Sequence, residues 1–271
     1  PPRMLPFPEP WLIKARAIVP AAQWAAFEAA LGGPRPVTFR VNRLLAEPSQ
    51  VLDELADLGP QPVPWCPDAF VLPPGTQLSS RAAWQDGRLY IQSLSSIAAT
   101  LALDPQPGEA ILDLCAAPGS KTSHIAAVQE NKGRLVANDA SRSRSFKLRA
   151  VLERLGAQAQ VKTGPGEQLG RRMREQFDRV LVDAPCSGEG RFHVDDPESW
   201  ARWSPGHVKR LASKQKMLLH AGIDAARPGG VIVYSTCTLS PEENEGVLAR
   251  ALKKYPVELE ELPIQLPGLP G

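Results

Sequence analysis

The sequence has few cysteines, and their arrangement marks neither a metal site nor a disulfide framework. Only four occur among the 271 residues, at positions 66, 115, 186 and 237, and none forms a C-x-x-C pair. Zinc ligands usually come in such closely spaced pairs, and disulfide frameworks belong to small secreted domains. We therefore predict reduced thiols, no metal ion and a cytoplasmic location.

Long apolar segments are also missing. No stretch approaches ~20 uninterrupted apolar residues, and no basic start followed by an apolar run marks a signal peptide. Apolar residues nevertheless make up 43% of the chain and charged residues 22%, so a core can form and the chain is not of the disordered type. We expect a folded protein without a membrane partner.

The chain has little net charge, but its basic residues cluster in two segments. The net charge is only +2, yet residues 142–179 hold ten Lys and Arg against four Asp and Glu, and residues 202–216 hold five against none. Such clusters suit the phosphate backbone of a nucleic acid, although ordinary solvated helix faces have the same composition. Charge alone leaves both alternatives open.

Hydrophobic periodicity divides the chain near residue 88. Residues 1–88 combine expected helices at 10–31 and 48–58 with expected strands at 36–42 and 64–72, as in a small α+β domain. Residues 89–271 alternate helices and strands, which predicts an α/β domain with a parallel, doubly wound sheet. In it we expect helices at 90–103, 120–128, 143–155, 208–226 and 242–254, and strands at 110–114, 134–138, 159–163, 177–183 and 230–235.

One segment has the pattern of a nucleotide-cofactor loop. Residues 111–121 (ILDLCAAPGSK) read as a strand, a turn of small residues and a helix start, where backbone N–H groups can hold an anion. The segment lacks G-x-G-x-x-G and phosphate-loop spacing, which disfavours a dinucleotide or ATP. Asp139 ends the next expected strand and could accept hydrogen bonds from both ribose hydroxyls, or cap the following helix. Together these features indicate an adenosine-bearing cofactor, whereas the turn alone could be purely structural.

Two later strand ends each present a cysteine. Residues 183–190 (DAPCSGEG) follow the most hydrophobic strand, and residues 235–241 (STCTLSP) follow the next one, so Cys186 and Cys237 should lie near each other. A buried structural thiol is the usual role of cysteine, but a Pro/Gly loop argues against it here. The pair could be redox-active or could share one covalent mechanism, and the missing C-x-x-C makes redox the weaker choice.

These motifs carry a family likeness. The chain resembles the Sun (NSUN) family of S-adenosylmethionine-dependent RNA cytosine-5 methyltransferases, the RsmB/RsmF-like enzymes. The matching segments, which span essentially the whole chain, are Arg40-Val-Asn42, 90–96 (YIQSLSS), 113–122, 183–190 and 234–244 (YSTCTLSPEEN).

The resemblance implies a fold and a cofactor. It implies a Rossmann-like class I methyltransferase sheet in residues 89–271, with an RRM-like RNA-binding domain in residues 1–88, and S-adenosyl-L-methionine as the cofactor. A seven-stranded sheet of this type would need another antiparallel strand after residues 257–262, which is missing here. Either the chain was trimmed or the sheet edge is covered differently.

The resemblance also implies residue roles. Cys237 of the Thr-Cys loop corresponds to the nucleophile that adds to carbon 6 of cytosine. Cys186 corresponds to the group that acts in a later step, either proton removal at carbon 5 or release of the adduct, and Asp183 to the group that bonds the pyrimidine edge. The cofactor contacts carry over to Cys115, Ala116, Ala117, Pro118, Gly119, Ser120, Lys121, Asp139, Arg144 and Asp183. Many relatives place an aspartate for adenine after the third strand. Residues 163–167 (TGPGE) lack it, so backbone groups or Glu167 would have to serve.

RNA is the partner that this likeness implies, with ribosomal RNA first and transfer RNA second, and the protein is expected to be a monomer. Because the target base must leave any stack, the substrate should be single-stranded or locally opened RNA. DNA cytosine methylation is a rival reading, since its nucleophile lies in a Pro-Cys loop. A non-catalytic RNA-binding scaffold is another.

Overall fold

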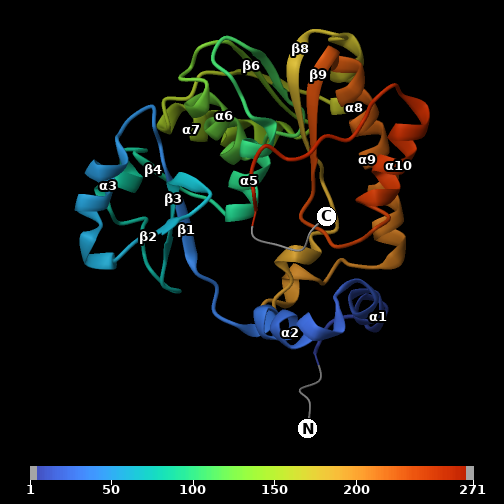
Figure 1. Cartoon of the computed structure of the whole chain (residues 1–271), viewed down its shortest axis with the longest axis horizontal. Coiled ribbons are helices and arrows are strands. Elements are labelled where there is room, and N and C mark those ends of the chain that lie inside the picture. Colours follow the sequence, from blue (N-terminus) through green and yellow to red (C-terminus); the bar gives the residue numbers. More distant parts are fainter. Residues whose placement is uncertain (1–4, 267–271) are drawn as a thin grey trace. The chain divides into compact units, whose positions relative to one another are not determined.

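The computed structural model describes residues 5–266 and contains two β-sheets (Figure 1). The chain folds into two compact units, each built from separate segments. One unit contains the residues up to Arg35 with Ala184–His220 and Ser235–Glu258, and the other contains Pro36–Asp183, Ala221–Tyr234 and the residues from Leu259. The functional division into residues 1–88 and 89–271 stays a prediction. Within residues 5–266, no helix combines the length and the apolar character that crossing a membrane would require.

The smaller sheet is antiparallel and has the order β2-β3-β1-β4. Its strands are β1 (Val37–Val41), β2 (Gln61–Val63), β3 (Cys66–Leu72) and β4 (Leu89–Ile91), and its helical segments are α3 (Pro48–Glu54), η2 (Ala56–Leu58) and α4 (Ala82–Gln85). Phe39 and Phe70 stack with their ring centroids 5.5 Å apart, and they share a buried cluster with Val51 of α3. Burial of these alternating apolar residues fixes which face of the sheet the helix covers.

The larger sheet has the order β7-β6-β5-β8-β9. Its strands are β5 (Ala110–Asp113), β6 (Arg134–Asp139), β7 (Gln160–Thr163), β8 (Phe177–Asp183) and β9 (Ala226–Ser235), and its helices are α5 (Leu94–Leu103), α6 (Ser120–Val128), α7 (Arg142–Arg154), α8 (Gly166–Arg172) and α9 (Pro205–Ala225). β5 pairs in parallel with both β6 and β8, and β6 with β7. The strand order therefore reverses between β5 and β8, the place where open α/β sheets bind ligands at their carboxyl ends. This confirms the expected fold class, and no strand follows β9 up to residue 266.

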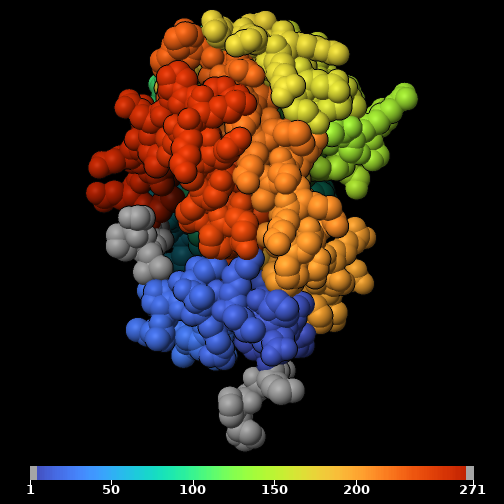
Figure 2. All heavy atoms as spheres, turned by 90° about the vertical axis from the view of Figure 1, so that its right-hand side faces the viewer, coloured from blue at the N-terminus to red at the C-terminus, as the bar shows by residue number. Residues whose placement is uncertain are grey.

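The other unit joins the start of the chain to its later part. Its helices are α1 (Glu9–Ile18), α2 (Trp24–Gly32), α10 (Glu245–Lys254) and the part of α9 up to His220, with short helical turns η1 (Ala21–Gln23), η3 (Glu189–Arg191) and η4 (Pro197–Ser199). An aromatic cluster of Phe7, Trp11, Phe192 and Trp203 forms its core. Figure 2 shows the three segments of this unit side by side, in blue, orange and red.

One expected helix was placed wrongly. Residues 90–103 were predicted to be helical throughout, but Leu89–Ile91 form β4, which pairs antiparallel with β1. The helix α5 begins only after Ser93, whose side chain accepts a hydrogen bond from the backbone N–H of Ser96. A serine cap followed by an apolar run marks a helix start. Pairing with β1 therefore decided the conformation of the residues before the cap.

Gly170 lets α8 approach α9 closely. A Cβ atom at this buried position would lie 2.3 Å from the backbone oxygen of Ala221. We expect Gly170→Ala to lower the free energy of unfolding by about 1–3 kcal/mol, because backbone must move to admit the methyl group. Chemical denaturation of the purified variant measures the change.

Gly164→Ala is the matched control. A Cβ atom at Gly164 would meet nothing within 4 Å. This variant should be neutral or slightly stabilising, since alanine restricts the unfolded chain more than glycine does. Equal stabilities of the two variants would contradict the close contact at Gly170.

Candidate active site

The loops that follow β8 and β9 bring Cys186 and Cys237 together. The backbone N–H of Ala184 donates to the carbonyl of Ser235 (2.9 Å), and that of Gly190 donates to the carbonyl of Cys237 (2.9 Å). The two Sγ atoms lie 3.1 Å apart, and the backbone N–H of Cys237 points at Sγ of Cys186 at 3.2 Å. Cys237 is exposed and Cys186 is half-buried. One exposed thiol thus lies in contact with a second thiol that is half-buried.

The environment of Cys186 keeps its thiol protonated. The hydrogen bond with Cys237 is the largest cause that raises the pKa of Cys186, and burial raises it further. At neutral pH the S–H of Cys186 is therefore available to donate to the sulfur of Cys237. Two thiols this close cannot both ionise readily, because the second charge would lie beside the first.

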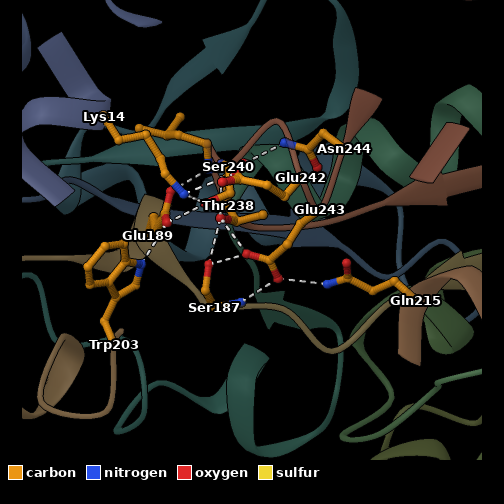
Figure 3. A network of polar contacts seen from close by, with 11 residues as sticks. Lys14, Ser187, Glu189, Trp203, Gln215, Thr238, Ser240, Glu242, Glu243 and Asn244 are labelled. Carbon is orange, nitrogen blue, oxygen red and sulfur yellow. Dashed lines mark hydrogen bonds and ion pairs between the residues drawn. The ribbon is translucent and has the colours of Figure 1, made fainter. Parts of the chain in front are cut away.

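Two buried glutamates, which the sequence reading did not single out, join these loops (Figure 3). Glu189 follows Cys186 by three residues, and Glu243 follows Cys237 by six. Both lie inside the segments that carry the family likeness, so their position in those motifs was the available signal. Their contacts show that each accepts hydrogen bonds from the opposite loop.

The expected cofactor loop connects β5 to α6 and is held against α7. Ala116 and Ala117 pack with Leu148 and Leu152 in one buried cluster. Gly119 has φ +113°, a conformation that favours glycine, and a Cβ atom there would lie 3.0 Å from the side chain of Leu148. Small residues therefore keep this turn close to the protein.

The start of α6 is suited to an anionic group. Among the described residues, no side chain caps the helix at Gly119. Backbone N–H groups in the first turn of a helix have no partner within the helix, and the helix dipole adds positive potential there. This nine-residue helix therefore presents its donors beside the loop.

Asp139 lies at the end of β6 and orders the loop from the other side. Its buried carboxylate accepts hydrogen bonds from the backbone N–H groups of Ala117 (3.3 Å) and Ser141 (2.9 Å). Arg144 reaches the same carboxylate at 3.3 Å and also donates to the carbonyl of Ala117. The N-cap of α7 is Ser141, so the alternative role of Asp139 as that cap is wrong.

Asn138 is a third residue that was not predicted from the sequence. Its side-chain N–H groups donate to the carbonyls of Leu114 (3.1 Å) and Gly164 (3.0 Å), which belong to the loops after β5 and β7. The side chain is buried, and the backbone carbonyl of Asn138 also accepts from Ala116. One residue therefore fixes the loops on both sides of β6.

Lys121 pairs with Asp183 across the carboxyl ends of β5 and β8. Its Nζ lies 2.6 Å from a carboxylate oxygen of Asp183 and 3.4 Å from the hydroxyl of Ser96. The lysine side chain is 11% exposed, whereas that of Asp183 is 34% exposed. The buried lysine therefore orients a carboxylate that stays partly exposed.

Arg40 joins the small sheet to the cofactor helix. This fully buried residue of β1 donates to Ser123 of α6 (2.7 Å) and to Gln92 (2.8 Å). Desolvation lowers the pKa of its guanidinium to about 10, which leaves it charged at neutral pH. The Arg40-Val-Asn42 segment thus contacts the helix that begins the candidate cofactor site.

Two family models together match nearly all of the chain. The model described as 16S rRNA methyltransferase RsmB/F matches residues 100–268, and the model of the N-terminal domain of 16S rRNA methyltransferase RsmF matches residues 7–94. The chain belongs to the RsmB/F methyltransferase family. Membership confirms the family likeness and, at the level of the family, S-adenosylmethionine as the cofactor.

Individual relatives agree with this assignment. The ribosomal RNA small subunit methyltransferase F of Klebsiella pneumoniae (strain 342) is 40% identical over 269 residues, which cover 95% of this chain and 56% of the relative. The relative of the same name from Cronobacter sakazakii is 38% identical over the same shares. The chain thus spans about half the length of the curated relatives it matches.

Solved structures support the fold. A methyltransferase homolog protein from Pyrococcus horikoshii, 33% identical, matches with a TM-score of 0.76 over 97% of this chain and 88% of that one. The structure of NSun6 from the same organism with SFG has a TM-score of 0.87 over 98% and 91%, and at 24% identity it supports the fold alone.

The structure also places Cys115 and Glu167, two other residues considered in the sequence analysis. Cys115 is half-buried, and burial raises the pKa of its thiol above the ordinary value, so it is not an activated nucleophile. Glu167 lies in the first turn of α8, directly after β7. Within residues 5–266, no group of three or more His, Cys, Asp or Glu side chains could hold a metal ion. The roles assigned to the site residues stay predictions.

Asp113, at the end of β5, makes folding sensitive to pH. Burial raises its pKa from 3.8 to about 7, while a hydrogen bond from Thr122 (2.7 Å) opposes the rise. In the unfolded chain the carboxyl ionises at its ordinary pKa. Stability should therefore fall as the pH rises from about 4 to 7 and then level off.

Asp113→Asn should remove this dependence, because an amide oxygen can accept the same bond from Thr122 without ionising. We expect the stability of the variant, relative to the parent, to increase between pH 4 and pH 7. Urea denaturation of both proteins at several pH values gives the difference between their free energies of unfolding. The contributions of the other titrating groups cancel in this difference. Parallel pH profiles would show that Asp113 ionises normally in the folded protein.

Proposed function

We propose that the chain transfers a methyl group from S-adenosylmethionine to carbon 5 of a cytosine in RNA, through a covalent bond between Cys237 and the base. The observation that carries this proposal is the pair of thiols, one exposed and one half-buried, with sulfur atoms 3.1 Å apart. Family membership supports methyl transfer, and the thiol pair supports the chemistry that cytosine carbon 5 requires.

The residues around the β5 loop fit the proposed cofactor. Asp139 offers carboxylate oxygens for ribose hydroxyls, and the start of α6 offers backbone N–H groups for a carboxylate. Arg144, which remains a predicted cofactor contact, and Asn138 hold the loop in place through hydrogen bonds to backbone carbonyls. When bound, S-adenosylmethionine supplies an electrophilic methyl group on a sulfonium.

Cys237 is the proposed nucleophile. Its thiol loses its proton to solvent, and the thiolate adds to carbon 6 of cytosine. The electron pair of the carbon 5–carbon 6 double bond then becomes available for carbon 5 to take the methyl group. Carbon 5 then carries both a hydrogen and the methyl group. Removal of that proton restores the double bond and expels Cys237 as a thiolate.

Cys186 is the proposed group for proton removal. The main cause of its raised pKa is the hydrogen bond with Cys237. Formation of the carbon–sulfur bond at Cys237 removes that hydrogen-bond partner, so the pKa of Cys186 falls, although burial still raises it, and its proton can pass to water. The thiolate can then accept the proton from carbon 5.

Asp183 and Lys121 are proposed to orient the base. The Asp183 carboxylate, held by Lys121, is the acceptor that precedes Cys186 by three residues in the chain. The partly exposed carboxylate can take hydrogen bonds from donors on the pyrimidine edge. The lysine fixes the carboxylate in one position, so little order has to be gained when the base arrives.

Small-subunit ribosomal RNA is the proposed substrate, and the relatives with that name support it. The basic residues of α7 agree with a phosphate backbone as partner, because Arg142, Lys147 and Arg149 are exposed on one helix. Transfer RNA and DNA of matching sequence are the competing substrates.

Adduct trapping tests the nucleophile. RNA with 5-fluorocytidine at the target carries no removable proton at carbon 5, so the parent protein should form a stable protein–RNA adduct. Cys237→Ala should form none and should lower methyl transfer by about a thousandfold or more. Denaturing electrophoresis with labelled RNA detects the adduct.

Cys186→Ala provides the matched comparison on ordinary RNA. It should accumulate adduct, because proton removal is slowed while addition continues. An adduct that survives Cys237→Ala would overturn the assignment of the nucleophile. Labelled methyl transfer to small-subunit ribosomal RNA, transfer RNA and DNA, followed by bisulfite sequencing, then identifies the substrate and the cytosine.

A further inference from the structure

We propose that Glu189 and Glu243 are positioning residues that hold the Cys186 and Cys237 thiols together, each glutamate anchoring the loop of the other cysteine. The inference rests on the proposed function for its catalytic meaning, whereas the positions of the thiols can be measured without it. Both side chains are buried, with exposures of 1% and 0%. Figure 3 shows them between the two loops.

Glu189 comes from the loop of Cys186 and binds the loop of Cys237. One carboxylate oxygen accepts from the hydroxyl of Ser240 (2.6 Å) and from the indole N–H of Trp203 (2.7 Å). The other oxygen accepts from the backbone N–H of Leu239 at 3.2 Å. Leu239 is only two residues beyond Cys237, so this contact fixes the backbone close to that thiol.

Glu243 comes from the loop of Cys237 and binds the loop of Cys186. Its Oε1 accepts from the backbone N–H of Ser187 (3.0 Å) and from the amide of Gln215 (2.7 Å). Its Oε2 accepts from the hydroxyls of Ser187 and Thr238. Ser187 is the residue next to Cys186, so this contact fixes the second thiol.

Two further elements strengthen the arrangement. Gln215 of α9 also donates to the carbonyl of Pro185, the residue before Cys186 (2.9 Å). Lys14 of α1 donates to Ser240 (3.0 Å) and pairs with Glu242 (3.0 Å). Burying a carboxylate is costly unless it is fully hydrogen-bonded, so a pair of buried glutamates needs a role that apolar residues could not fill.

Substitution by glutamine should have different effects at the two positions. Glu189 faces donors that cannot accept, Trp203 on one oxygen and Leu239 on the other. A glutamine there must turn its NH₂ group toward one of them. At Glu243, the partners on Oε2 are hydroxyls, which can accept a hydrogen bond as well as donate one. Glu189→Gln should therefore break the contact, and Glu243→Gln should keep it.

Thiol–disulfide exchange measures how well the thiols are positioned. Oxidised dithiothreitol takes two electrons and two protons from Cys186 and Cys237, which form one disulfide while the reagent becomes a dithiol. Their sulfurs, 3.1 Å apart, need to close to about 2.05 Å. Peptide mapping by mass spectrometry quantifies this disulfide at equilibrium and hence the effective concentration of the two thiols.

We expect Glu189→Gln and Glu243→Ala to lower that effective concentration about tenfold or more, and Glu243→Gln to change it less than about twofold. With a reductant present, the kcat of methyl transfer should fall in Glu189→Gln and Glu243→Ala and change little in Glu243→Gln. The KM for RNA should be unchanged in all three. Binding of S-adenosylhomocysteine and thermal unfolding provide the controls for folding. If glutamine preserves kcat and the effective concentration at position 243 but not at position 189, the losses come from positioning and not from general destabilisation.

An unchanged effective concentration in Glu189→Gln would overturn the proposal, and so would equal losses in Glu243→Gln and Glu243→Ala. If the thiols respond as expected but no variant or parent methylates RNA, the proposed function fails and the positioning role stands. If the parent methylates RNA and all variants match it, the positioning role fails alone.

Discussion

Two thiols on separate loops stay within 3.1 Å of each other only if both loops are held, and here the holding groups are buried carboxylates. A loop has no regular hydrogen-bond ladder of its own, so its backbone donors need partners from elsewhere. Glu189 and Glu243 provide these partners reciprocally. Cys237 can remain exposed while its loop is held, because the holding carboxylates are themselves buried.

The cofactor loop follows the same physical rule with different groups. Asp139 and Asn138, at the end of one strand, supply the acceptor and the donors that order backbone on either side. Small side chains then let the turn pack on α7. In both places a polar side chain on or next to a regular element organises irregular backbone, which leaves the loop surface available for ligands.

The sequence predicted the larger sheet well because its strands are short apolar runs flanked by turn residues. Phe177–Asp183 was predicted to the residue, and α6 likewise. Tyr90 and Ile91 of the edge strand Leu89–Ile91 were assigned to a helix, because only pairing with β1 makes this short segment a strand. The proximity of Cys186 and Cys237 followed from strand order. The contacts of Glu189 and Glu243 did not, because the partners of a buried carboxylate depend on how distant loops meet.

Asn138 constrains how this fold can diverge. Its single amide group spans the turns after β5 and β7, so a change in the length of one turn would pull on the other through the same side chain. Insertions at the carboxyl ends of these strands should therefore be poorly tolerated. Evolutionary variation in loop length should collect at the opposite edge of the sheet, where this tether does not reach.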